Sequence, residues 1–225
     1  MNVMVPQTAT VGRAGSLRRP GWLMIATLGV AVLYVVAAVA TMPVERSGDL
    51  TAAQMADIRP GWVVMNVLWA APVLLVAAAY WTVAAALPVS RLATVTRILA
   101  VMAAAGAVCY AGLTLSLLSF DAPRLADDAR HDTSTLVSLG AYWAAVLATV
   151  LVGVALFRSR ELRRTGLAVA VIAGLLLVTD VIAYLPGLTG SVPLDEVASF
   201  PPMLLALVWL ALGIGLVRRR VASVA

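Results

Sequence analysis

The residue whose type and position most clearly predict a site is Asp180. It stands within a long apolar stretch at 165–185, where a carboxylate is costly and usually faces a cavity or a polar partner. Tyr184 follows one helical turn later and would share the same face of a helix. A carboxylic acid in this place can anchor a ligand, act as a general acid or join two helices through a hydrogen bond.

Other polar and aromatic side chains occur at a similar depth in the remaining apolar stretches. Together with Asp180 they could line one pocket, with the carboxyl group as its polar anchor. In the structural alternative, Asp180 is protonated or hydrogen-bonded to Asn66 or a tyrosine, and the aromatic rings simply pack. The predicted ligand-binding residues are Asp180, Asn66, Tyr184, Trp69, Tyr110, Tyr142 and Trp143, and Tyr34 and Thr114 lie at the same level.

A second group of ionisable residues lies at 121–133 and contains Asp127, Asp128, His131 and Asp132. A helical turn would gather these carboxylates around the only histidine of the chain, and such a set could hold a divalent cation. The spacing matches no specific metal signature, so a solvated acidic loop is the favoured interpretation. One histidine cannot supply bis-histidine haem ligation, and we expect neither a metal nor another cofactor.

The sequence lacks the motifs that mark several classes of enzyme. It has no Walker-type loop, no His-Glu-x-x-His, no Gly-x-Ser-x-Gly and no Cys-x-x-Cys. The net charge of +5 would suit nucleic acid, but the arginines flank apolar stretches, so we exclude a nucleic-acid partner. Cys109 is the only cysteine, and we expect it to be a small buried apolar residue.

The elements that position these residues are predicted to be membrane-spanning helices. Of the 225 residues, 62% are hydrophobic and 12% are charged, and the mean hydropathy is +0.98. The hydrophobic fraction is far above that of a soluble domain, and the charged fraction is far below it. About twenty apolar residues in a helix cross a hydrocarbon core of about 30 Å. We predict an all-α polytopic domain over residues 1–225. Its six transmembrane helices are expected at about 22–42, 61–87, 92–120, 134–157, 165–185 and 200–217.

Arginine placement predicts the orientation of these helices. All basic residues are arginine, which suggests a GC-rich bacterial genome, and 12 of the 16 fall on the side that holds both termini. The positive-inside rule assigns that side to the cytoplasm, so we predict N-in and C-in topology in a bacterial cytoplasmic membrane. The first apolar stretch also imitates a signal peptide, but it is longer than the roughly 7–15 residues of a signal core.

Small residues and prolines predict how the helices pack and where they end. Small residues at helical spacing let backbones approach closely, within the bundle or between two copies. Prolines are expected at the ends of apolar stretches, except Pro72, which lies inside the second stretch and predicts a kink. The small residues are Gly140, Ala144 and Ala148 in the fourth stretch and Gly166, Ala170 and Gly174 in the fifth, and the end-marking prolines include Pro60 and Pro186.

Two local patterns resemble known families. Gly48-Asp49 followed by Thr51, then Leu87-Pro88, Arg91-Leu92-Ala93 and Arg97, resemble an uncharacterised bacterial family of six-span proteins, a domain of unknown function. This resemblance covers most of the chain and implies topology only.

The second pattern, Pro193-Leu194-Asp195-Glu196 followed by Phe200, is similar to the Pro-x-Glu-Glu and Phe motif of the small membrane lycopene cyclases. Those enzymes are thought to protonate an isoprenoid, so the resemblance implies Asp195 and Glu196 as candidate acids. The chain has a single copy of the motif, with Asp195 where the family has glutamate.

Three functions remain open on this sequence. We expect a non-enzymatic membrane module that binds or helps to transport a small or lipidic ligand, or that assembles with a partner membrane protein or a second copy. The alternative is a membrane enzyme acting on a lipid or isoprenoid, with Asp180, Asp195 or Glu196 as general acid. A third is a structural or sensory subunit whose acidic loops form the contact surface.

Overall fold

The computed structural model describes residues 17–41, 52–87, 90–116, 129–158, 162–189 and 201–218. These residues are helical almost throughout and contain no strand, which confirms the predicted all-α fold. The helices are α2 (Arg18–Thr41), α3 (Ala52–Ala86), α4 (Arg91–Ser116), α6 (Ala129–Arg158), α7 (Arg163–Thr189) and α8 (Pro201–Arg218).

Two helices continue through prolines that were expected to mark the ends of apolar stretches. α3 begins at Ala52 and contains both Pro60 and Pro72, and α7 continues past Pro186 to Thr189. Pro60 and Pro186, which were expected to mark the ends of membrane spans, therefore lie inside longer helices. A proline removes a single backbone donor, and a helix continues through it when other groups satisfy the freed carbonyl. Pro201 lies in the first turn of α8 as expected, where its missing N–H is harmless.

The helices have the length and surface of membrane-spanning elements. Within the described ranges, α2, α3, α4, α6 and α7 are long and apolar enough to cross a membrane. α8 is also apolar but has 18 residues, about 27 Å at 1.5 Å per residue. Large apolar side chains point outward, among them Val39, which is 74% exposed. Such a surface is compatible with lipid as the surrounding solvent.

Cys109 belongs to this outward surface. It is exposed on α4, so the expectation of a buried position was wrong. A helix face that meets lipid accepts small apolar side chains as readily as a protein core does, and burial in protein therefore does not follow from low polarity in such a chain.

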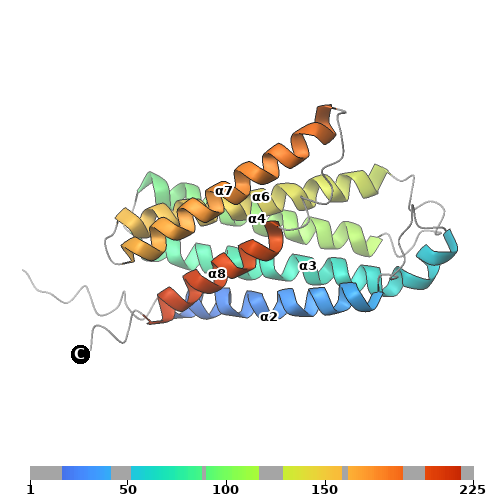
Figure 1. Cartoon of the computed structure of the whole chain (residues 1–225), viewed down its shortest axis with the longest axis horizontal. Coiled ribbons are helices and arrows are strands. Elements are labelled where there is room, and N and C mark those ends of the chain that lie inside the picture. Colours follow the sequence, from blue (N-terminus) through green and yellow to red (C-terminus); the bar gives the residue numbers. More distant parts are fainter. Residues whose placement is uncertain are drawn as a thin grey trace, which may run out of the picture.

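The six helices pack as a ring in chain order. Each described helix contacts the next one, α8 returns to α2, and α3 also contacts α6 across the ring. This cross-contact divides the ring into a group of three helices (α3, α4 and α6) and a group of five (α2, α3, α6, α7 and α8). In Figure 1, α7 and α8 run obliquely to the other four helices.

One end of the bundle carries most of the described arginines. α2 and α7 begin there, at Arg18 and Arg163, and α6 and α8 end there, at Arg158 and Arg218 (Figure 1, left). Close contacts join these ends, because the backbones of α2 and α8 touch there and Thr165 of α7 lies against α8. We call this the arginine end.

Glycines allow the closest approaches between helices. A Cβ atom on Gly21 of α2 would stand 2.9 Å from the Gly213 carbonyl oxygen of α8. A Cβ on Gly153 of α6 would stand 2.8 Å from the carbonyl oxygen of Gly166 and 2.7 Å from the backbone nitrogen of Ala170, both in α7. No side chain fits at such distances, so these helices meet backbone to backbone.

The predicted rows of small residues were correct in part. Gly166 and Ala170 make the close contact with α6, whereas Cβ atoms on Gly140 and Gly174 would meet nothing within 4 Å. The sequence pattern did not single out Gly153, because the small residues that it contacts in space lie on another helix.

An aromatic cavity as the candidate functional site

A cavity lies within the five-helix part of the ring. Three helices can close-pack around a common line, whereas five leave a central space that side chains must fill. The remaining empty space, counted out to its open mouth, is about 550 Å3. Its lining comes from α2, α3, α6 and α8 and consists of Ala31, Tyr34, Val35, Trp69, Pro72, Val73, Tyr142, Ala206 and Trp209.

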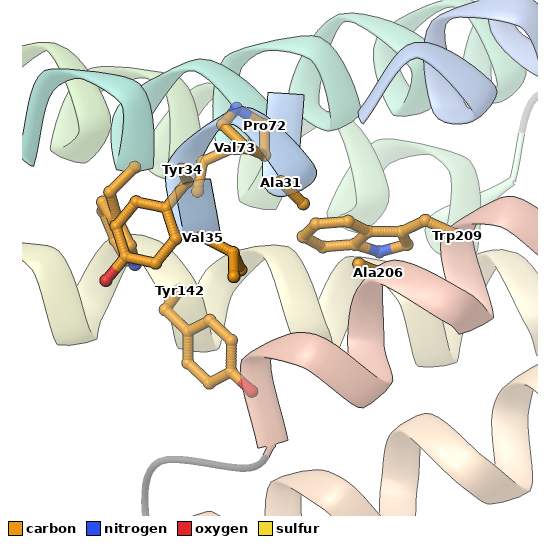
Figure 2. A pocket seen from close by; sticks show the side chains of 9 residues that line it. Ala31, Tyr34, Val35, Pro72, Val73, Tyr142, Ala206 and Trp209 are labelled. Carbon is orange, nitrogen blue, oxygen red and sulfur yellow. The ribbon is translucent and has the colours of Figure 1, made fainter. Parts of the chain in front are cut away.

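The cavity extends from the middle of the bundle away from the arginine end. At 1.5 Å per residue, Trp209 lies about 13 Å along α8 from Arg218, whereas Tyr34 lies about 24 Å along α2 from Arg18. Tyr142 lies at a similar depth in α6. Figure 2 shows Tyr34 and Tyr142 on one side of the cavity and Trp209 on the other. The two tyrosines therefore mark the end far from the arginines, and Trp209 marks the deep end.

The wall of the cavity is aliphatic and aromatic. Among the described residues that line it, the side-chain polar atoms are the hydroxyls of Tyr34 and Tyr142 and the indole nitrogens of Trp69 and Trp209, and none of these residues is charged. A cavity of this size and character suits an apolar ligand with few hydrogen-bonding groups.

Trp209 is fixed by a buried hydrogen-bond hub on Thr149 of α6. The Thr149 hydroxyl donates to the Ala145 carbonyl at 2.8 Å and accepts from the indole N–H of Trp209 at 3.1 Å. It also lies 2.5 Å from the hydroxyl of Tyr80 in α3. A threonine hydroxyl has one proton and two lone pairs, so Tyr80 is the donor in that bond. The hub uses the only polar group of Trp209 and leaves its ring to form the cavity wall.

The part of α2 beside the cavity has no buried residue. The buried residues of α2 are Pro20, Gly21, Met24 and Thr27, all in the part nearest the arginine end. From Leu28 onward every residue of α2 is at least partly exposed. α2 and α8 are in backbone contact at Gly21, and further along the cavity separates them.

Three of the predicted ligand-binding residues and their neighbour Tyr34 belong to this region. Trp69, Tyr142 and Tyr34 line the cavity. Tyr110 does not, but its ring meets Trp69 edge to face, with ring centroids 4.9 Å apart and planes at 66°. Edge-to-face pairs of this kind hold ring orientation, so Tyr110 positions Trp69 in the cavity wall.

Asp180 lies elsewhere, between α6 and α7. Its side chain is 2% exposed, and its Oδ2 accepts a hydrogen bond of 2.9 Å from the indole N–H of Trp143. Neither Asp180 nor Trp143 lines the cavity. The structural alternative had assigned Asn66 or a tyrosine as the partner, but the observed donor is tryptophan. Asp180 and Trp143 thus form a polar contact between two helices.

The remaining predicted residues cannot be placed against these two sites. Asn66 and Tyr184 belong to α3 and α7, and His131 and Asp132 belong to α6, but their side chains lie outside the described part of the chain. Asp127, Asp128, Asp195 and Glu196 lie entirely outside the described residues. Among the residues that are described, no group of three or more histidine, cysteine, aspartate or glutamate side chains could hold a metal ion.

Sequence reasoning missed Trp209. It was available as the one tryptophan of the last apolar stretch. It lies near the middle of that stretch, however, whereas the other candidates lie toward the far ends of theirs. A tryptophan at that depth needs a hydrogen-bond partner for its indole N–H, and Thr149 at the corresponding depth of α6 was the available signal.

Comparison with known proteins identified no relative of this chain. No protein-family model, no curated protein and no solved structure matches the chain.

Proposed function

We propose that this chain is a non-enzymatic membrane protein that binds a small or lipidic molecule in the aromatic cavity. The observation that carries the proposal is the cavity itself, an apolar space of about 550 Å3 walled by Tyr34, Trp69, Tyr142 and Trp209. A ligand there would be held by apolar contact and aromatic packing. Handing such a ligand to a partner membrane protein, or across the membrane, fits the same site.

We further propose six spans with both termini in the cytoplasm of a bacterial cell. The gathering of arginines at one end of α2, α6, α7 and α8 supports a cytoplasmic arginine end. With α8 counted as a sixth span, the number of spans is even, and an even number places both termini on the cytoplasmic side. Its length of about 27 Å is within reach of a hydrocarbon core of about 30 Å when flanking residues adapt.

The absence of reactive groups among the described residues of the wall supports binding over catalysis. General acid–base chemistry needs a titratable group within hydrogen-bonding reach of the reacting atom. The nine lining residues include no carboxyl, imidazole, thiol or amine side chain. Asp180, the buried carboxyl group among the described residues, lies instead against Trp143.

The direct test is mass spectrometry of molecules that copurify with the protein in mild detergent. Two variants narrow the cavity, Ala31→Leu and Ala206→Leu, because both alanines line it. Their matched controls are Ala40→Leu on α2 and Ala211→Leu on α8, where the same change falls on exposed positions. We expect the cavity variants to lose a copurifying molecule that the controls and Asp180→Asn retain.

Two results would contradict the proposal. Retention of every copurifying molecule by folded Ala31→Leu and Ala206→Leu would show that nothing occupies the cavity. A product of altered mass after incubation with polyprenyl substrates would show that the protein is an enzyme.

A further inference from the structure

On the basis of the proposed function, we infer that the cavity takes a single chain of an uncharged lipid. The ligand class is an isoprenoid or acyl molecule with a hydroxyl or carbonyl oxygen at its polar end. The chain points toward Trp209 and the oxygen lies at the level of Tyr34 and Tyr142. The inference rests on the charge of the wall, the positions of its polar groups and the packing of α2.

The wall excludes a charged head group. No arginine is among the described residues that line the cavity, and Arg59, toward the far end of α3, is about 15 Å from Trp69 along the helix. An unpaired phosphate or carboxylate in an apolar site within a membrane is strongly disfavoured. Tyrosine hydroxyls, in contrast, both donate to and accept from a neutral oxygen.

The polar groups of the wall orient the ligand. The indole N–H of Trp209 is already bound to Thr149, so the deep end offers only the ring and aliphatic carbons. At the other end, Tyr34 is partly exposed on a helix that lines the cavity. A hydrocarbon chain therefore meets apolar surface when it points inward, and its oxygen meets Tyr34 when it points outward.

The packing of α2 gives the route of entry. α2 and α8 are locked together at Gly21 and Gly213, but none of the residues of α2 beyond Thr27 is buried. The seam between these helices is therefore tight near the arginine end and loose beside the cavity. A chain from the surrounding lipid can enter through this seam without crossing the core.

The volume limits the ligand to one chain. The empty space, counted out to the open mouth, measures about 550 Å3 in all. Part of this volume is the open mouth, so a second long chain finds no room beside the first.

Photo-crosslinking of the full-length protein in lipid nanodiscs tests the inference. One probe is a long-chain alcohol with a diazirine at the far end of its chain, and the matched probe is its phosphate monoester. We expect the alcohol to label α8 around Trp209, and Ala206→Leu to reduce this labelling by about fivefold or more. Ala31→Leu supplies a second cavity variant on another helix, and Ala211→Leu is the control expected to label as the unchanged protein does.

The outcomes separate this inference from the proposed function. Stronger labelling of the cavity by the phosphate ester would overturn the uncharged class, and chain-end labelling at Tyr34 instead of Trp209 would overturn the orientation. In both cases binding in the cavity, and so the proposed function, would stand. Equal labelling of unchanged protein and both cavity variants by both probes would overturn the two together.

Discussion

At the residue scale, the buried polar groups explain why tyrosine, threonine and tryptophan occur in the middle of an apolar bundle. Tyr80, Thr149 and Trp209 come from α3, α6 and α8, and every hydrogen-bonding capacity of the Thr149 hydroxyl is used. In the hydrocarbon core of a membrane, no water is present to form a hydrogen bond with an unsatisfied polar group. The hub therefore ties three helices together and sets the orientation of the ring that closes the cavity.

Thr149→Val tests the hub with a change that preserves side-chain shape. The variant leaves the Tyr80 hydroxyl and the Trp209 indole without their acceptor, and we expect a loss of about 1–3 kcal/mol in the free energy of unfolding. The measurement is thermal or denaturant unfolding in detergent, followed through loss of monodisperse protein.

The matched control is Thr179→Val in α7. The Thr179 hydroxyl also donates to the carbonyl four residues earlier, at 2.9 Å, but the residue is exposed and lacks the cross-helix partners of Thr149. We expect it to change stability by no more than about 0.5 kcal/mol. Equal effects of the two substitutions would mean that the hub contributes nothing across helices.

The sequence located Asp180 but not its partner. Its depth follows from counting residues along one helix, so a buried carboxyl group in an apolar bundle could be predicted. Its neighbour depends on how far α6 and α7 are rotated about their axes, and Asn66, Tyr142 and Trp143 all offered donors at that depth. Adjacent residues of a helix point about 100° apart. Tyr142 consequently faces the cavity while Trp143 faces Asp180.

At the element scale, the fold depends on pairs of helices that meet without intervening side chains. Existence and approximate placement of all six helices followed from apolar runs. The close contacts did not, because they join residues distant in sequence, such as Gly21 to Gly213. Pro60 and Pro186, expected at the ends of spans, lie inside helices, since a helix continues beyond the residues that lipid requires to be apolar.

Gly153→Ala tests the contact between α6 and α7. The new methyl group would lie 2.7 Å from the Ala170 nitrogen and 2.8 Å from the Gly166 oxygen. Both are backbone atoms that cannot move aside without shifting α7. Overpacking of this kind typically costs about 1–3 kcal/mol, and we expect a lower midpoint of thermal unfolding in detergent.

Gly174→Ala provides the opposite case on α7. A Cβ there would meet nothing within 4 Å, so the substitution adds helix propensity without a clash. We expect a gain of up to about 0.5–1 kcal/mol. Two substitutions of identical chemistry should thus shift the unfolding midpoint in opposite directions. A shift in the same direction at both sites would contradict the backbone contact at Gly153.

At the scale of the whole molecule, the ring arrangement connects the fold to the candidate site. The contact between α3 and α6 leaves three helices on one side and five on the other, where the described cavity lies. The pattern of apolar stretches predicted the six helices that the structure describes. It could not predict which pair would cross the ring, and that pair decides where the space remains.

The proposed topology depends on α8, because the side on which the C-terminus lies changes if α8 does not cross the membrane. Reporter fusions decide this: green fluorescent protein is fluorescent in the cytoplasm, and alkaline phosphatase is active only outside it. We expect fusions near Arg160 and at the C-terminus to fluoresce, and a fusion near Asp128 to have phosphatase activity. If α8 remained on the outer side, the C-terminal fusion would instead have phosphatase activity while the Arg160 fusion still fluoresced. If the fusions near Arg160 and Asp128 reported the same side, α6 would not cross the membrane, and the assignment of the arginine end to the cytoplasm would lose its basis.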